Sequence, residues 1–191
     1  MNTVESSLMS VFTDKPVVLY GHSMGSKIAF ELAHILSRRG VELLRVVVSG
    51  GAAPDLESRS PTLYKLEDEA FVEEFRRLKG TPEEVLNNQD LMRLIIPFVR
   101  ADYTLNDTYN FTEGEPLDCP ITALGGTDDP DVNEMEIRGW ERHTKSQFTY
   151  SMYSGDHFFI FEHKKEVVNE IRRGLVNPSP KLYMIQNFMD L

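Results

Sequence analysis

Cysteine is nearly absent from this sequence of 191 residues, in which Cys119 is the single example. One thiol can form neither an internal disulfide nor a cysteine metal cluster. Such sparing use of cysteine is typical of reducing compartments, so we expect a cytoplasmic protein. No group of ligating residues has the spacing of a metal site, and we expect no metal or other cofactor.

Basic residues are also few. Lysine and arginine total 20 against 30 aspartate and glutamate residues, which gives a net charge of −10. This balance argues against nucleic acid as a partner and against binding to an anionic membrane surface. No apolar run approaches the roughly 20 residues that a membrane-spanning helix needs. Residues 1–5 lack the pattern of a signal peptide.

Short apolar runs alternate with amphipathic stretches along the chain. Residues 16–21 and 43–49 are short, mainly apolar runs rich in β-branched residues, a pattern that favours strands buried on both faces, as in parallel sheets. Further strands are predicted at 121–126 and 148–153, and helices at about 1–13, 24–39, 133–143 and 164–175. This order predicts an α/β fold with a mostly parallel sheet, built as a single domain over residues 1–191.

The stretch from about 54 to 112 differs from its surroundings. It is charged, helical in period and free of strong strand signals. Helices are predicted near 67–78 and 89–99, and residues 81–84 have the pattern of a helix start. Pro97 is predicted to interrupt the helix near 89–99. A helical insertion between strands is typical of a lid over a site. The tail from residue 177 to 191 is not placed by any pattern.

The sharpest motif is Gly-His-Ser-Met-Gly at residues 21–25, where a predicted strand meets a predicted helix. In that context a tight turn lifts the hydroxyl of Ser23 clear of the sheet, which favours a nucleophile. The N–H of Met24, at the helix N-terminus, is then the natural first donor to an oxyanion. The ordinary alternative is a serine that caps a helix after a glycine turn.

A serine nucleophile needs a base, and the chain has five histidines. His157 is the best candidate because it follows the last predicted strand in a Gly-Asp-His turn. That turn lies at the carboxyl ends of the strands, the same edge as Ser23. His22 lies inside the elbow and is expected to point away from the hydroxyl. The remaining three are placed within or beside predicted helices: His34, His143 and His163.

The base in turn needs a carboxylate, which the loop after residues 121–126 supplies. Asp129 fits best because Pro130 and the turn after the strand restrict its backbone. Asp128 is the alternative, because a sequence pattern does not fix positions in a loop to within one residue. Asp131 is a third carboxylate in the same loop. Serine, aspartate and histidine follow one another in the order of the α/β-hydrolase fold.

Five segments spread through nearly the whole chain resemble those of one family, the type II thioesterases of nonribosomal peptide, polyketide and fatty-acid synthesis. The segments are residues 20–25, 79–86, 94–103, 119–126 and 155–159. The resemblance implies a Ser23–His157–Asp129 triad and a lid that forms the acyl and carrier-protein channel. The implied reaction is hydrolysis of acyl thioesters on the phosphopantetheine arm of an acyl or peptidyl carrier protein.

The N-terminal part departs from that family, whose members have several strands before the elbow. We therefore expect an N-terminally truncated thioesterase that lacks the upstream strands and the loop with the second oxyanion donor. Losing one such donor costs about 100- to 1,000-fold in turnover. The strand at residues 17–20 is then expected to expose an apolar edge, through which the chain self-associates.

Two other readings follow from the same residues. A serine triad does not by itself select thioesters, so a carboxylesterase or acyltransferase is the alternative enzyme. The loss of an oxyanion loop also allows a weakly active or inactive homologue that binds carrier protein.

Overall fold

A parallel sheet of five strands organises the computed structural model, which describes residues 15–57, 62–173 and 181–184. The spatial order of the strands is β4-β3-β2-β1-β5, and every neighbouring pair is parallel. The strands are β1 (Val17–His22), β2 (Leu43–Ser49), β3 (Ile121–Gly126), β4 (Phe148–Tyr153) and β5 (Lys181–Met184). The predicted α/β fold with a parallel sheet is therefore confirmed.

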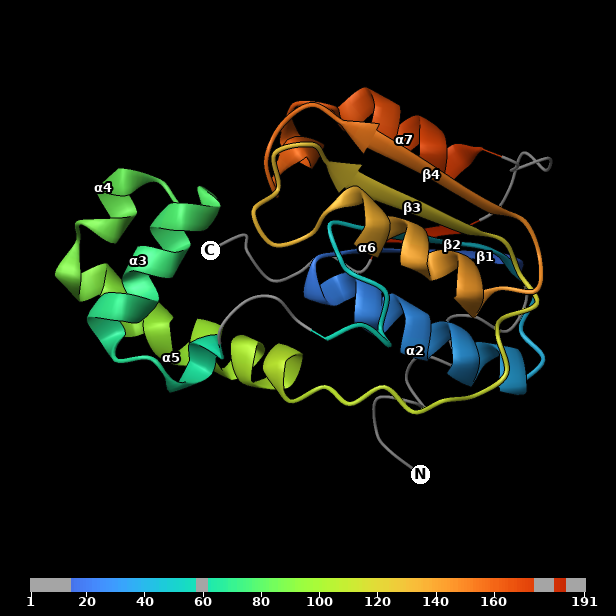
Figure 1. Cartoon of the computed structure of the whole chain (residues 1–191), viewed down its shortest axis with the longest axis horizontal. Helices are drawn as coiled ribbons and strands as arrows, with labels where there is room; N and C mark the ends of the chain where they lie inside the picture. Colours follow the sequence, from blue (N-terminus) through green and yellow to red (C-terminus); the bar gives the residue numbers. More distant parts are fainter. Residues whose placement is uncertain (1–14, 58–61, 174–180, 185–191) are drawn as a thin grey trace.

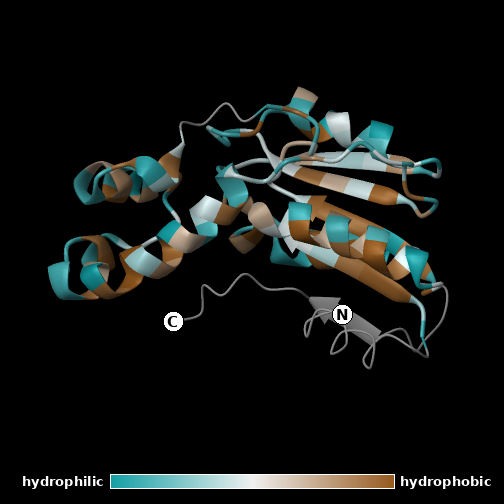
Figure 2. Ribbon diagram, turned by 90° about the horizontal axis from the view of Figure 1, so that it is seen from below, coloured by the Kyte–Doolittle hydropathy of each residue, from teal (hydrophilic) through white to brown (hydrophobic). Residues whose placement is uncertain are grey.

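Helices cover both faces of the sheet (Figure 1). On one face lie α2 (Met24–Arg38), α6 (Glu134–Arg138) and the 3-10 turn η2 (Gly139–His143); on the other lie η3 (Phe159–Phe161) and α7 (Lys164–Arg172). Strands β1, β2 and β3 are therefore largely buried between the two helical layers, whereas β4, at the edge of the sheet, is half-buried. Figure 2 shows brown, hydrophobic strands within the sheet and helices of mixed colouring. In β1, Val17 and Leu19 pack toward α2, whereas Val18 and Tyr20 pack toward α7.

The free edge predicted for β1 is wrong. Strand β5 pairs with β1 in parallel, from Val17 opposite Lys181 to Tyr20 opposite Met184. The N–H and C=O groups of β1 that face away from β2 therefore have partners within the chain. This removes the physical reason for the predicted self-association through that edge.

The helical insertion lies beyond the carboxyl ends of β3 and β4, toward which their arrowheads point in Figure 1. Its elements are the 3-10 turn η1 (Leu63–Lys65), α3 (Asp68–Leu78), α4 (Glu83–Leu86) and α5 (Gln89–Asp107). It has a small hydrophobic core of its own, centred on Phe71, Phe75 and Ile96. We use the name helical insertion for these described residues, 62–107.

The predicted interruption at Pro97 is also wrong, because α5 continues through it to Asp107. A proline inside a helix leaves the carbonyl four residues earlier without its usual donor. Here that carbonyl belongs to Arg93, and both Arg93 and Pro97 lie on the exposed side of α5. Water can bind the carbonyl there, so the proline is tolerated.

Smaller differences concern the ends of elements. The helix predicted over 133–143 is divided into α6 and η2, and α7 ends at Arg172. The helix predicted over 1–13, the end of the one predicted to 175, and most of the tail lie outside the described residues. Within the described residues, no helix is both long enough and apolar enough to cross a bilayer.

Candidate active site

Ser23 lies in a strained turn between β1 and α2. Its backbone has φ 55° and ψ −124°, a region that residues with a side chain rarely occupy. The turn is closed by a hydrogen bond of 2.7 Å from the Ser23 N–H to the carbonyl of Ser49, at the end of β2. Such strain persists only when the surrounding structure enforces it, and it is frequent at functional sites.

Gly21 is needed for this turn because its backbone passes very close to that of Gly25 at the start of α2. A Cβ at residue 21 would lie 1.9 Å from the carbonyl oxygen of Gly25, which is backbone and cannot move aside. The hydroxyl of Ser26 secures the same crossing. Its oxygen lies 3.1 Å from the Gly21 carbonyl and 2.9 Å from the Ser49 carbonyl, and it accepts the Ser49 N–H at 3.1 Å.

Ser23, His157 and Asp129 form one hydrogen-bonded series. The Oγ of Ser23 lies 2.9 Å from Nε2 of His157, and Nδ1 of His157 lies 2.8 Å from Oδ2 of Asp129. An ionised carboxylate can only accept, so Nδ1 carries the proton and donates to Asp129. In the neutral ring Nε2 is then an acceptor for the Ser23 hydroxyl.

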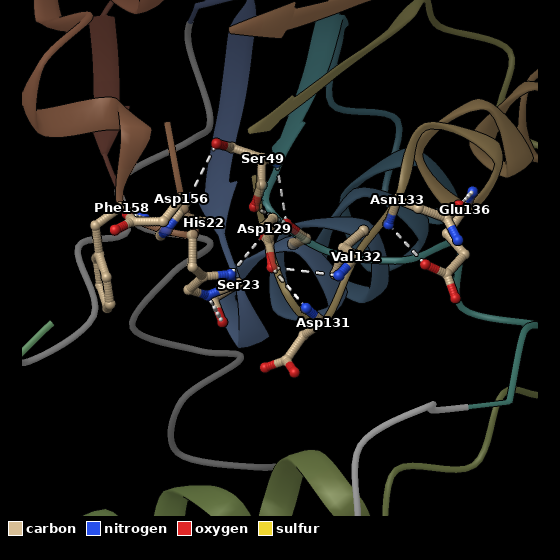
Figure 3. Close-up of polar contacts among 12 residues, drawn as sticks. His22, Ser23, Ser49, Asp129, Asp131, Val132, Asn133, Glu136, Asp156 and Phe158 are labelled. Carbon is tan, nitrogen blue, oxygen red and sulfur yellow. Dashed lines mark hydrogen bonds and ion pairs between the residues drawn. The ribbon is translucent and has the colours of Figure 1, made fainter. Parts of the chain in front are cut away.

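Asp129, not Asp128, contacts the imidazole. The side chain of Asp129 is 1% exposed, and its second oxygen accepts the backbone N–H groups of Asp131 and Val132 at 2.9 and 3.2 Å. Figure 3 shows the carboxylate directed at these two groups. Asp128 is exposed and instead accepts from the N–H of Gly155 at 3.3 Å.

The other four histidines do not contact the Ser23 hydroxyl. His22 is turned toward β2, with Nδ1 3.0 Å from Oγ of Ser49 (Figure 3), and His143 lies 2.7 Å from a carboxylate oxygen of Asp55. His163 lies 3.1 Å from Oγ of Ser154, and His34 packs edge-on against Phe30.

His22 and His157 lie with ring centroids 5.1 Å apart. Burial, together with the positive charge that His157 would carry, lowers the pKa of His22 to about 3, although Asp129 opposes this. His22 is therefore neutral across the physiological range, and it forms an uncharged wall beside the imidazole of His157.

A cavity of about 430 Å³ opens onto Ser23, Met24 and His157. Lys27, one helical turn beyond Ser23 on α2, lies at its wall, and its ammonium group donates to the carbonyl and side-chain oxygens of Asn106 at 3.2 and 3.0 Å. Burial lowers the pKa of Lys27, although the charge of Asp107 opposes this.

A second, more apolar cavity of about 240 Å³ lies within the helical insertion. Leu78 and Tyr103 line both cavities, so the two adjoin at these side chains. A ligand of moderate size at Ser23 could therefore extend into the insertion. Within the described part of the chain, no cluster of three or more His, Cys, Asp or Glu side chains could hold a metal ion.

Comparison with known proteins identifies the family to which this geometry belongs. A family model described as "Thioesterase domain" matches residues 6–175. The chain belongs to the thioesterase family.

Among curated relatives of this thioesterase-family chain, Gramicidin S biosynthesis protein GrsT of Aneurinibacillus migulanus is 40% identical over 154 residues. Thioesterase PikA5 of Streptomyces venezuelae is 40% identical over 161 residues. The matches cover 80% and 84% of this chain but 60% and 57% of those proteins. The chain therefore spans about three fifths of the length of these relatives.

Solved structures give the same assignment. The structure of the type II thioesterase BorB from the borrelidin biosynthetic cluster is 38% identical, with a TM-score of 0.80. That of ClbQ from the colibactin NRPS/PKS pathway is 32% identical, with a TM-score of 0.81. The likenesses cover 90% and 89% of this chain, and 71% and 72% of those chains.

Two further parts of the predicted site in this thioesterase-family chain concern the oxyanion. Met24 is the first residue of α2, so its N–H has no carbonyl within the helix to donate to, and it stays the predicted first donor. The expectation that a second donor is lacking concerns the residues before β1, of which 1–14 lie outside the described residues, so it stays a prediction. The role of Ser26 could not be predicted, because a serine inside a predicted helix gives no sign that its hydroxyl binds the backbone of Gly21 and Ser49.

Proposed function

We propose that this chain hydrolyses acyl thioesters, with Ser23 as nucleophile, His157 as general base and acid, and Asp129 as the carboxylate that orients the base. The observation that carries the proposal is the unbroken hydrogen-bonded series from Ser23 Oγ through His157 to Asp129. Its members come from the ends of β1, β3 and β4, which supports a site assembled by the fold rather than a local turn.

The geometry accounts for each step of the reaction. Ser23 Oγ attacks the thioester carbonyl while Nε2 of His157 takes the hydroxyl proton. The C–S bond then breaks, His157 returns the proton to the departing sulfur, and the acyl group stays on Ser23 as an ester. Next, His157 removes a proton from water, the resulting hydroxide attacks the ester, and the proton returns to Ser23 as the carboxylic acid leaves.

Asp129 contributes by holding His157 in the tautomer that this sequence requires. Its carboxylate accepts from Nδ1–H, so Nε2 faces Ser23, and it stabilises the imidazolium that forms during each attack. The two backbone N–H groups that bind its other oxygen keep the carboxylate in place. The N–H of Met24 is proposed to donate to the oxyanion, as expected of the first residue of a helix.

The proposed substrate is an acyl group on the phosphopantetheine arm of an acyl or peptidyl carrier protein. This assignment is supported by the similarity to type II thioesterases from biosynthetic clusters. Residues 54–112 are proposed to act as the lid, because the cavity within the helical insertion adjoins the one at Ser23.

Hydrolysis of paired thioester and oxyester analogues tests the proposal. We expect the chain to release free thiol from short acyl thioesters of N-acetylcysteamine, and Ser23→Ala to abolish the release. His157→Gln is expected to behave likewise, whereas His163→Gln, a histidine on a nearby turn, keeps activity within about twofold, as is usual for a surface substitution. Thioester hydrolysis that survives Ser23→Ala would disprove the assignment, and faster oxyester cleavage would favour a carboxylesterase.

A further inference from the structure

The end of α3 contacts the acid side and the base side of the site separately. Arg77, in the last turn of α3, forms an ion pair of 2.7 Å with Asp131. Gly80, two residues beyond the helix, packs against the ring of Phe158. Asp131 is two residues from Asp129, and Phe158 directly follows His157. One short stretch of the insertion, residues 77–80, therefore lies against the supports of both groups.

The Arg77 contact acts on the residue whose backbone holds the carboxylate. The N–H of Asp131 donates to Oδ1 of Asp129 at 2.9 Å, and the side chain of Asp131 is bound by Arg77. The guanidinium is itself oriented by Glu74, one turn earlier on α3, at 2.7 Å. The side chains of Arg77 and Asp131 are 34% and 21% exposed, so the pair is partly shielded from water.

The Phe158 contact acts on the imidazole. The ring of Phe158 lies edge-to-face on His157, with centroids 5.2 Å apart and an angle of 89°, and it stacks on Phe161 at 5.8 Å. One edge of the ring lies so close to Gly80 that a Cβ at residue 80 would lie 2.2 Å from Cε2 of Phe158. Movement of residue 80 would therefore shift the Phe158 ring, which contacts His157.

Phe158 is also the one residue lining the apolar cavity that lies outside the insertion; the others fall between residues 75 and 103. A group that fills this cavity would contact Phe158, whose ring also contacts His157. Occupancy of the insertion and the position of the base are thus connected through a single side chain.

We infer that Arg77 and Phe158 are positioning residues, through which the end of α3 aligns Asp129 and His157 with Ser23. The inference rests on the proposed thioesterase function, and it makes the alignment depend on where the helical insertion lies. With residues 77–80 in contact, the acid and the base are both supported. With the insertion displaced, Asp131 loses its partner and the Phe158 ring loses the surface against which it packs.

Arg76 provides a matched control. It is the adjacent arginine, its side chain is also 34% exposed, and it too has two acidic partners. Those partners, Glu73 and Glu83, lie within the helical insertion, so the Arg76 ion pairs do not reach the acid loop. Arg76→Gln therefore removes the same charge from the same helix without touching the support of Asp129.

The decisive experiment compares kcat and KM of Arg77→Gln and Arg76→Gln on an N-acetylcysteamine thioester, which excludes effects on carrier-protein docking. We expect Arg77→Gln to lower kcat about 10-fold with KM little changed, within the hundredfold that a displacement of about 1 Å can cost. Arg77→Lys should recover most of the loss. Arg76→Gln should stay within about twofold of the parent.

Labelling by a fluorophosphonate separates the positioning role of Arg77 and Phe158 from the proposed thioesterase function, because labelling needs an activated Ser23 but no thioester. Arg77→Gln, Phe158→Leu and Gly80→Ala should all label more slowly than the parent, and Arg76→Gln should not. Equal kcat values and labelling rates for the two arginine variants would overturn the inference. So would an Arg77→Gln variant whose KM rises while its kcat stays that of the parent. A parent that labels but hydrolyses no thioester would instead overturn the proposed function.

Folding of each variant is followed by thermal unfolding. Arg77 is partly exposed, so Arg77→Gln is expected to fold. If it does not, Asp131→Asn breaks the same ion pair from the other side while keeping the N–H that binds Asp129, and the same outcomes apply to it.

Discussion

Nε2 of His157 lies 2.9 Å from Oγ of Ser23, although the two residues are 134 positions apart in the chain. The fold closes this distance because β1 and β4 run parallel, so the segments that follow them emerge at one edge of the sheet. Asp129, from the end of β3, enters the same edge between them. The three groups are therefore brought together by topology, and their alignment is open to mutational test.

Asp129 and Asp128 allow a test of the carboxylate by neighbouring substitutions. Asp129→Asn should lower kcat for thioester hydrolysis by about 1,000- to 10,000-fold, because an amide can stabilise the wrong tautomer of His157. Asp128→Asn should stay within a few-fold, since Asp128 contacts the N–H of Gly155 rather than the imidazole. Thiol release measured for both variants checks this, and equal losses would contradict the assignment.

His22 should make stability depend on pH. Its pKa is about 3 in the folded chain and about 6.5 when unfolded, so between these values the unfolded state binds more protons. Stability is therefore lost as pH falls from about 6.5 toward 3. In His22→Gln, the slope of unfolding free energy against pH should fall by up to about 1.4 kcal/mol per pH unit. Urea unfolding at several pH values measures it; unchanged slopes would refute it.

Gly21 should tolerate no side chain. The 1.9 Å approach of a Cβ to the Gly25 carbonyl requires the elbow to open, which we expect to cost about 3 kcal/mol or more and to abolish hydrolysis. Gly114→Ala is the control, because its Cβ would meet nothing closer than 3.9 Å. Thermal unfolding of the two variants gives the comparison, and a Gly21→Ala protein with the parent's melting temperature and activity would argue against the described turn.

Strand β5 should protect β1 from association. A chain ending at residue 180 exposes the N–H and C=O groups of β1 that pair with β5 in the full chain. We expect this shortened chain to form larger species in a concentration-dependent way, because a hydrophobic strand edge pairs readily with another chain. A chain ending at residue 184 retains the strand and serves as the control in size-exclusion chromatography. Identical elution of both would contradict a protective role.

The buried strands could be predicted because each is a short, continuous apolar run bounded by turn residues. Ser23 and His157 could be placed at one edge because each follows such a run within a few residues. The choice of Asp129 over Asp128 depended on the restriction imposed by Pro130, and the coordinates place Asp129 on the imidazole.

Other features could not be predicted because they depend on tertiary contacts between distant segments. Strand β5 carries no strong local signal, and its pairing with β1 emerges only once the sheet is assembled. Pro97 is tolerated because of the side of α5 on which it lies. The ion pair of Arg77 with Asp131 joins residues whose proximity no periodicity indicates.

Ser23 and Asp129 emerge from strands that do not touch each other. The two strands, β1 and β3, both pair with β2. Leu19 of β1 lies opposite Val46 of β2, and the same Val46 lies opposite Ile121 of β3. The pairing registers of β1 and β3 with β2 thus fix the separation between Ser23 and Asp129, although β2 supplies neither residue. A slip of one residue along either of its ladders would carry one group past the other by about 3.3 Å, roughly the length of a hydrogen bond. Substitutions in the buried part of β2 that shift this register would therefore abolish hydrolysis, although they contact no substrate and leave the helical insertion intact.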